Sequence, residues 1–365
     1  MKKKFYFISY FLVILIIYIS FGIFGIFEIN NYKELLFKNR TDLEFHKNYS
    51  DKIHHLRDVN KLNSGNNNYL FSEIIFNDNF KKTILLQGDS WIEDISNIKN
   101  SELFVKNFGK NNKINIYNAG ITSFAPSVMH AQFKILKKDF NIFPQILIIH
   151  LDQTDIGDES CRYKHNKIYS SNGDLIRVQR EKFTRATYDY SKIYLYSELY
   201  LSNNLLKILK FPYLKTQYFI KRNFNLVNQI QQKGFKLRND SKCGFYQIQK
   251  ELMNYDYSSK VNFQKSLKEY LEFLSYEKNL EKIYLTSFPH LNNLKHIYEV
   301  NISEYIDEVL VPFDNKRFKH INMSKMDFSS VKIESIYREN DVASHLNDYY
   351  HKDLFLREIL SKINK

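Results

Sequence analysis

A serine in the first third of the chain and a histidine near its end have the residue types of a nucleophile and a base. Ser90 follows an apolar run at residues 84–87 and precedes a stretch that could start a helix. A serine hydroxyl attacks a carbonyl carbon only when a base removes its proton, and histidine is the usual base. His345, just before an amphipathic C-terminal stretch at 354–363, is the candidate base, and Asp341 lies four positions before it.

An aspartate this close in sequence can orient a histidine ring and stabilise its protonated form, which completes a Ser–His–Asp relay. The other reading of Gly88-Asp89-Ser90 is a plain turn, since Gly, Asp and Ser are among the commonest turn residues. The surroundings of Ser90 are not G-x-S-x-G, which excludes the nucleophile elbow of α/β-hydrolases. The tripeptide alone does not decide between the two readings.

Short apolar runs predict the elements that would bring these residues together. The runs cover residues 82–87, 114–120, 146–151 and 282–288, with a weaker fifth at 308–313. Continuous Ile, Leu and Val runs are typical of parallel strands covered on both faces, and helical patterns at 128–140 and 263–279 fit between them. We therefore expect one three-layer α/β domain with a central parallel sheet. Ser90 would then stand at the carboxyl edge of the sheet, where such folds bind ligands.

Four motifs in this order resemble the SGNH, or GDSL-type, hydrolase superfamily from about Lys81 to the C-terminus. They are Gly88-Asp89-Ser90 after the first strand, Asn118-Ala119-Gly120 after the second, residues 152–155 after the third, and His345-Leu346-Asn347 before the last helix. The resemblance implies a flavodoxin-like three-layer fold and a serine hydrolase or acyltransferase, here as a divergent, membrane-anchored member.

The resemblance also implies a role for each motif. Ser90 would be the nucleophile, His345 the base and Asp341 the residue that orients the base. The backbone N–H groups of Ser90 and Gly120 would form the oxyanion hole. Thr154 stands where the family has an asparagine that donates to the oxyanion. A threonine hydroxyl can donate one hydrogen bond, so we expect Thr154 to be the third donor.

Two departures from the family pattern concern acidic residues. Asp152 occupies the glycine position of the third motif, while Asp155 keeps its carboxylate and is expected to hold the loop in place. Together with Asp89 they are predicted to support the site. The step from Asp341 to His345 is one residue longer than the family's D-x-x-H. Either the loop bulges by one residue, or Asp341 is not the third member of the relay.

The N-terminus indicates a membrane. Lysines at positions 2–4 precede a charge-free run from Phe5 to Phe27, which is long enough to cross a bilayer and lacks a small-residue cleavage site. We expect an uncleaved signal anchor at residues 1–29, with the lysines inside and the remainder extracytoplasmic, or periplasmic. A stalk at 30–70 and the hydrolase-like domain at 71–365 would follow.

Residues 160–259 form an insertion between the third and fourth predicted strands. Asn172-Gly173 between β-prone flanks predicts a hairpin, and the aromatic, basic stretch at 190–224 is helix-compatible. The helices could pack on the domain, form a substrate lid or lie against the membrane. Cys161 and Cys243 could form a disulfide in an oxidising compartment or remain two buried thiols.

The net charge of +13 comes without an arginine-rich stripe or zinc-ligand spacing, which argues against nucleic acid as a partner and favours an anionic surface. No metal or other cofactor is expected. We expect a membrane-anchored ester hydrolase or O-acyltransferase whose substrate bears an ester, with an acylated cell-envelope glycan implied by the family resemblance. The alternatives are a lipase- or thioesterase-like enzyme and a catalytically inactive SGNH scaffold that binds glycan or envelope partners.

Overall fold

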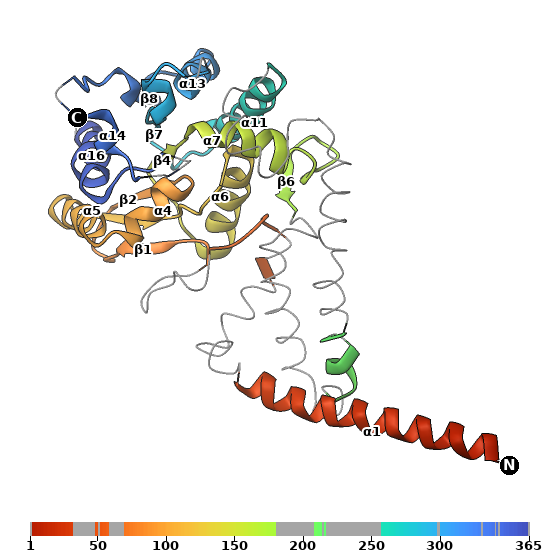
Figure 1. Cartoon of the computed structure of the whole chain (residues 1–365). Helices are drawn as coiled ribbons and strands as arrows, with labels where there is room; N and C mark the ends of the chain where they lie inside the picture. The colour runs from red at the N-terminus through yellow and green to blue at the C-terminus, as the bar shows by residue number, and fades with distance from the viewer. Residues whose placement is uncertain are drawn as a thin grey trace. The chain divides into compact units, whose positions relative to one another are not determined.

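The structure is a computed structural model, and the part of it described below comprises eleven stretches of chain. They are residues 2–31, 48–49, 52–57, 69–179, 208–213, 215–216, 257–297, 300–329, 331–339, 341 and 344–363. The chain divides into two compact units, Met1–Asp51 with Arg180–Asn239 and Lys52–Gln179 with Asp240–Lys365. Each unit is described by itself, and many of the helices and strands are labelled in Figure 1.

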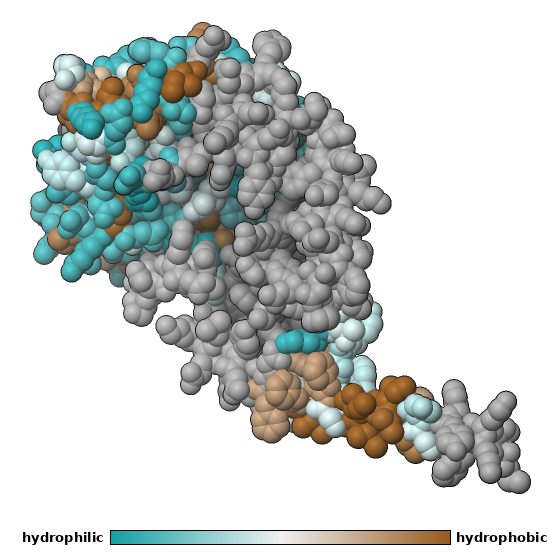
Figure 2. Space-filling view, viewed as in Figure 1, coloured by the Kyte–Doolittle hydropathy of each residue, from teal (hydrophilic) through white to brown (hydrophobic). Residues whose placement is uncertain are grey.

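The first unit contains the long apolar helix α1, Lys2–Asn31. Its segment Ser9–Phe27 is long and apolar enough to cross a membrane, judged by length and composition. Its apolar side chains are brown in Figure 2. Helical residues 208–213 of the insertion contact α1 within this unit, since the Tyr18 hydroxyl donates to the Leu209 carbonyl and the Phe21 and Phe211 rings lie 5.9 Å apart. Most of the predicted helical stretch at 190–224 lies outside the described residues.

The second unit is built on a six-stranded sheet with the spatial order β1-β3-β2-β4-β7-β8. The strands are β1 (Ser72–Ile75), β2 (Lys82–Gln87), β3 (Ile114–Asn118), β4 (Ile146–His150), β7 (Lys282–Ser287) and β8 (Phe318–Asn322). All neighbours except β1 and β3 pair in parallel, so the predicted central parallel sheet is confirmed. Numbered along the chain, the parallel strands have the order 2-1-3-4-5, which is the flavodoxin-like order.

Helices cover both faces of this sheet. The helices and helical turns of the unit are α4 (Ser90–Asn97), α5 (Lys99–Asn112), α6 (Pro126–Phe140), α7 (Gln153–Gly157), η2 (Asp158–Tyr163), α11 (Tyr257–Ser275), α12 (Leu291–Leu294), α13 (Ile302–Leu310), η3 (Met323–Lys325), α14 (Ile333–Ile336), α15 (Asp348–Tyr350), η4 (His351–Leu356) and α16 (Arg357–Ile363). One face is covered by α4, α5 and α16, and the other by α6, α11 and α13 (Figure 1). The predicted helices at 128–140, 263–279 and 354–363 are confirmed in outline.

The core explains why the strand runs are apolar throughout. Alternate strand residues such as Leu86, Ile116 and Ile148 face the layer of α4, α5 and α16 and join one buried apolar cluster with it. The intervening residues of the same strands are also buried, because the second helical layer covers the opposite face. On that side a polar contact is built into the core, where the Tyr270 hydroxyl on α11 donates to the side-chain carbonyl of Gln87.

The predicted fifth strand at 308–313 is wrong. This run is the end of α13 followed by a turn, and the fifth parallel strand is β8. Ile302, Tyr305, Ile306 and Val309 are buried at helical spacing, whereas Val311 is exposed, so the period of the apolar residues is that of a helix. The antiparallel edge strand β1 was not expected either, because its apolar run is short.

The sequence predicted a hydrolase-like domain that begins at residue 71. The sheet-containing unit also includes chain before that residue, from Lys52 on. Ile53, Leu56 and Arg57 are buried in this unit, although the predicted stalk includes them. The described stalk residues 30–31 and 48–49 belong to the first unit, whereas 52–57 and 69–70 belong to the second, and residues 32–47, 50–51 and 58–68 lie outside the described chain.

Two predictions about the insertion can be compared with the structure. The hairpin is confirmed, with β5 (Lys167–Tyr169) antiparallel to β6 (Leu175–Val178) and Gly173 in its turn at a φ of 86°, which favours glycine. Cys161 is disulfide-bonded, which answers the choice between a disulfide and free thiols. Cys243, the only other cysteine of the chain, lies outside the described residues.

Candidate active site

The candidate site lies where the chain order of the parallel strands reverses. β2 and β4 are neighbours, and the chains that leave them lead to helices on opposite faces of the sheet. In open α/β sheets this reversal leaves a crevice beyond the carboxyl ends of the two strands, and ligands bind there. Ser90 follows β2 directly, and Asp152 follows β4. The sheet therefore places the serine motif and the third motif at the same edge.

Helix α4 begins at Ser90, and the residue before it favours this start. Asp89 is the N-cap residue of α4, and its side chain accepts a hydrogen bond from the backbone N–H of Trp91 at 3.0 Å. A cap of this kind satisfies one of the N–H groups that the first turn leaves without a helical partner. Ser90 is thereby fixed in the first turn, where its backbone N–H has no intrahelical acceptor and the helix dipole favours negative charge.

Ser90, His345 and Asp341 form a continuous hydrogen-bonded chain. Oγ of Ser90 lies 2.5 Å from Nε2 of His345, and Nδ1 of His345 lies 2.6 Å from Oδ2 of Asp341. A carboxylate accepts only, so Nδ1 carries a proton and donates it, which leaves Nε2 of a neutral ring to accept from the Ser90 hydroxyl. Ser90 is partly exposed, and so are the side chains of both partners. The three residues that sequence reasoning singled out thus meet in space.

The long step between Asp341 and His345 is accommodated by the backbone. Ser344 has a φ of 55°, in the left-handed region that ordinary residues rarely adopt, and its N–H donates to the carbonyl of Asp341 at 3.1 Å. The His345 carbonyl accepts from the N–H of Arg338 at 2.8 Å, which anchors the loop to the chain before it. The extra residue is therefore taken up in a turn, and the aspartate still reaches the ring.

The electrostatics of His345 suit a base. Burial disfavours the charged ring, but the hydrogen bond and the negative charge of Asp341 outweigh burial, so the pKa of His345 is raised above its usual value. A second histidine fixes the helix that bears Ser90, since Nε2 of His351 donates to the carbonyl of Trp91 at 2.9 Å and Nδ1 accepts from Ser101 at 2.9 Å. Burial lowers the pKa of His351, which therefore stays neutral in this structural role.

The predicted oxyanion donors are less accessible. The backbone N–H of Gly120 donates to Oδ1 of Asn118 at 2.9 Å. Gly120 also packs so closely on α4 that a Cβ there would lie 2.4 Å from the backbone N of Glu93, which only glycine allows. The Thr154 hydroxyl donates to Oδ1 of Asp152 at 2.6 Å, so its proton is committed within its own loop.

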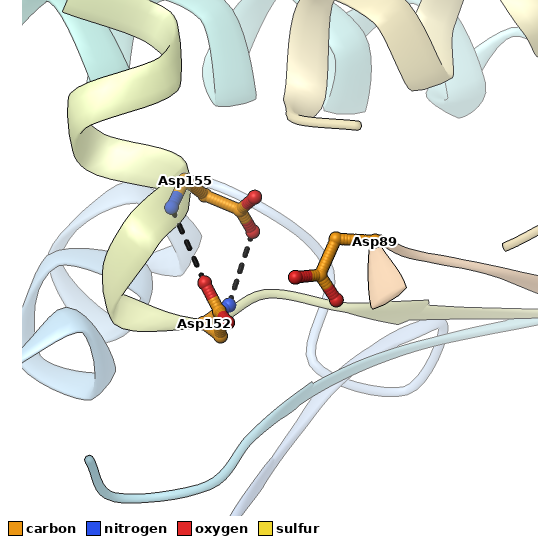
Figure 3. Close-up of side chains that lie close together, drawn as sticks. All are labelled: Asp89, Asp152 and Asp155. Atoms are coloured by element: carbon orange, nitrogen blue, oxygen red, sulfur yellow. Dashed lines mark hydrogen bonds between the residues drawn. The ribbon is translucent and has the colours of Figure 1, made fainter. Parts of the chain in front are cut away.

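Three buried carboxyl groups, those of Asp89, Asp152 and Asp155, lie close together at the edge of the sheet that bears Ser90. Asp89 points toward Asp152 and Asp155, and their oxygen atoms lie within 4.8 Å of one another (Figure 3). Asp152 caps α7, accepting from the N–H groups of Thr154 and Asp155, while Asp155 accepts in return from the N–H of Asp152, so the two form a capping box. This agrees with the expectation that Asp155 holds the loop in place.

Burial, reinforced by the neighbouring carboxylates, raises the pKa of both Asp89 and Asp155 well above the usual range. The raised pKa values favour the protonated forms of Asp89 and Asp155 more than those of an ordinary aspartate. Asp89 lies 3.2 Å from Oγ of Ser90, and a protonated Asp89 does not compete with His345 for the proton of Ser90.

A second Ser–His–Asp chain exists within the described residues. Oγ of Ser287, at the end of β7, lies 2.8 Å from Nε2 of His320, whose Nδ1 lies 2.6 Å from Oδ1 of Asp307. It could not be predicted from the sequence, because the three residues come from three elements and match no motif. Ser287 is fully buried, and its hydroxyl also bonds with that of Ser303. A buried hydroxyl cannot reach a substrate, so this chain is a structural counterpart to the first.

No protein-family model matches the chain, and no curated protein matches its sequence. Two solved structures are similar to it. One is a family two carbohydrate esterase from Clostridium thermocellum in complex with cellohexaose, at 9% identity and a TM-score of 0.35, with 80% of this chain and 66% of that chain covered. The other is an acetyl xylan esterase from the rumen bacterium Butyrivibrio proteoclasticus, at 8% identity and a TM-score of 0.36, with 80% and 65% covered. The chain thus spans just under two thirds of the length of these esterases.

Proposed function

We propose that the chain is a serine ester hydrolase or O-acyltransferase of SGNH type. The observation that carries the proposal is the hydrogen-bonded chain from Oγ of Ser90 through the ring of His345 to Asp341. Ser90 attacks the ester carbonyl carbon while Nε2 of His345 takes the proton, and His345 then returns this proton to the departing alcohol. Water or an acceptor hydroxyl attacks the resulting acyl-enzyme, and His345 repeats the proton transfer.

The oxyanion is held by backbone N–H groups. The N–H of Ser90 is available in the first turn of α4, and the N–H of Gly120 is the second donor. In the free protein Oδ1 of Asn118 accepts from Gly120. A charged oxyanion is a stronger acceptor than an amide oxygen, so it would take over this hydrogen bond as charge develops. We assign the Thr154 hydroxyl to its own loop, because it donates to Asp152.

The N-terminal helix supports a proposal for the location of the site. We propose that α1 anchors the chain in the membrane, with the lysines at 2–4 inside and the catalytic unit extracytoplasmic. The disulfide at Cys161 supports an oxidising compartment. An acylated cell-envelope glycan suits this location.

The test uses the full chain in detergent micelles. We expect wild-type protein and Ser287→Ala to react with a fluorophosphonate probe and to hydrolyse p-nitrophenyl acetate, and Ser90→Ala to do neither. Labelling of Ser90 without hydrolysis would favour transfer to a specific acceptor. Faster turnover of p-nitrophenyl palmitate than of the acetate would favour the lipase-like alternative. Failure of wild-type protein in both assays would favour the inactive scaffold and contradict the proposal.

A further inference from the structure

The loop that carries Gly120 is held by residues that precede the sheet. Arg57 is 3% exposed. One guanidinium nitrogen donates to the carbonyl of Gly120 at 2.8 Å and to that of Asn118 at 3.3 Å, and the other donates to the Ser72 hydroxyl on β1. A planar guanidinium with five donors can bond several acceptors at once, which the single ammonium of lysine cannot do in the same geometry.

Glu93 holds the other end of the same loop. Its carboxylate, 2% exposed on the first turn of α4, accepts from the backbone N–H of Thr122 at 3.0 Å and from the Thr122 hydroxyl. Nε of Arg57 lies 3.8 Å from Oε1 of Glu93. The buried charges of Arg57 and Glu93 therefore compensate each other, and both side chains also hydrogen-bond to the loop Asn118–Thr122.

A histidine adds a third contact from the same segment. Nε2 of His55 lies 2.7 Å from the carbonyl oxygen of Thr122, so this nitrogen carries a proton and donates it. Two residues of the segment Lys52–Arg57 thus bind the two ends of one short loop. The loop bonds to α4 as well, because the Asn118 side chain donates to the carbonyl of Ile92 at 2.9 Å.

We propose that Arg57 is a positioning residue that, together with Glu93, fixes the peptide of Gly120 relative to Ser90, an inference that rests on the proposed role of Gly120 as an oxyanion donor. When an oxyanion draws the Gly120 N–H away from Asn118, the loop loses an internal hydrogen bond. The carbonyl groups of Asn118 and of Gly120 itself remain bonded to Arg57, so the backbone that carries the N–H keeps its position. The segment before the sheet is then part of the active site.

The main variant is Arg57→Lys, which keeps the charge and loses the fork of donors. Arg317→Lys is the matched control, because Arg317 is a half-buried arginine that also bonds backbone carbonyls, those of Leu274 and Ser275 at the end of α11. Glu93→Gln is the second variant, since glutamine can still accept from Thr122 but carries no charge. All are made in the full chain in detergent micelles.

We expect Arg57→Lys to lower kcat for p-nitrophenyl acetate roughly 10- to 100-fold, because the oxyanion donor is misplaced rather than lost, and to change KM by less than about threefold. The midpoint of the acid limb of the pH–rate profile should not move, because His345 and Asp341 are untouched. Amide hydrogen exchange should accelerate in peptides covering 118–122. Glu93→Gln should change kcat and exchange in the same direction by a smaller factor, and Arg317→Lys should change neither.

Wild-type kcat in Arg57→Lys, or unchanged exchange at 118–122, would overturn the proposal, as would an equal loss of kcat in Arg317→Lys. If Arg57→Lys does not fold, Glu93→Gln decides on the same two measurements. If wild-type protein turns over no ester, the proposed function fails, while exchange at 118–122 in Arg57→Lys still decides whether Arg57 holds the loop.

Discussion

The indole ring of Trp91 lies 6.0 Å from the imidazole ring of His345, measured between ring centroids. Trp91 is the only tryptophan of the chain, it is 2% exposed, and it directly follows Ser90. His150 lies even closer, at 5.1 Å, but burial lowers its pKa to about 3. Emission excited selectively from tryptophan, rather than from the 27 tyrosines, therefore reports one residue, and of the two histidines described beside it His345 is the one whose pKa is raised.

This arrangement predicts a fluorescence titration. A protonated imidazole accepts an electron from excited indole more readily than a neutral one, so protonation of His345 should quench Trp91. We expect emission to fall as pH decreases, with a midpoint above 6.5 because the pKa of His345 is raised. His345→Gln should remove the transition, and His150→Asn should leave its midpoint in place. A transition that survives in His345→Gln would show that another group titrates beside Trp91.

Asp341→Asn should impair the base in two measurable ways. The variant loses the carboxylate that holds the ring with Nε2 free, so kcat should fall roughly 10²- to 10⁴-fold. It also loses the contribution that raises the pKa of His345 and leaves burial, which lowers it. Because His345 acts as a base when neutral, the acid limb of kcat/KM should move to lower pH.

The matched control is Asp307→Asn, which changes the corresponding carboxylate of the buried Ser287–His320 chain. We expect its pH–rate profile to coincide with that of wild type. An unshifted acid limb in Asp341→Asn would mean that Asp341 is not the third member of the relay, which is the alternative that the long D-x-x-x-H spacing leaves open in the sequence.

Thr154→Val tests the third predicted oxyanion donor. The Thr154 hydroxyl donates to Asp152 in the structure, so removing it should loosen the capping box of α7 and lower kcat by less than about tenfold. Loss of an oxyanion donor typically costs about 10²–10³ in rate. Steady-state kinetics with p-nitrophenyl acetate separates the two ranges. A loss of 10² or more, with unchanged thermal stability, would restore Thr154 to the oxyanion hole.

Local sequence patterns predicted those parts of the fold that depend on residues close together in the chain. The runs at 82–87 and 146–151 could be read as buried strands because both faces of the sheet are covered, and Asp341 and His345 lie in one loop. The misassigned strand at 308–313 shows the limit, because a window of six residues is too short to reveal the helical period that begins at Ile302.

Contacts between elements that are far apart in the chain could not be predicted from this single sequence. Arg57 lies 63 positions from Gly120 and belongs to a stretch whose composition resembles a stalk. The Ser287–His320 pair matches no motif, although its geometry resembles that of Ser90 and His345. The difference between the two serines is their exposure, which depends on how α13 packs beside β7, and this is a property of the folded chain.

Asp155→Asn should change how stability depends on pH. The pKa of Asp155 is raised in the folded chain, so folding takes up a proton, and the contribution of this group to stability is lost as pH rises from the unfolded pKa through the folded one. Asparagine keeps an oxygen for the N–H of Asp152 and does not titrate. We therefore expect the free energy of unfolding of the variant to rise relative to wild type between pH 4.5 and pH 8, by about 1.4 kcal/mol for each unit by which the pKa is raised. Denaturant titrations followed by Trp91 emission measure it.

The same measurement distinguishes two ways in which the negative charge of Asp89, Asp152 and Asp155 could be neutralised: by bound protons or by a bound metal ion. If protons neutralise the cluster, added Mg²⁺ or Ca²⁺ leaves the denaturation midpoint of wild type unchanged. The free energies of unfolding of wild type and Asp155→Asn then diverge as pH rises. A bound cation, for which converging carboxylates are suitable ligands, would instead stabilise wild type, and Asp155→Asn would lose that gain. Parallel curves for the two proteins at every pH, with or without cation, would show that Asp155 is ionised in the folded chain.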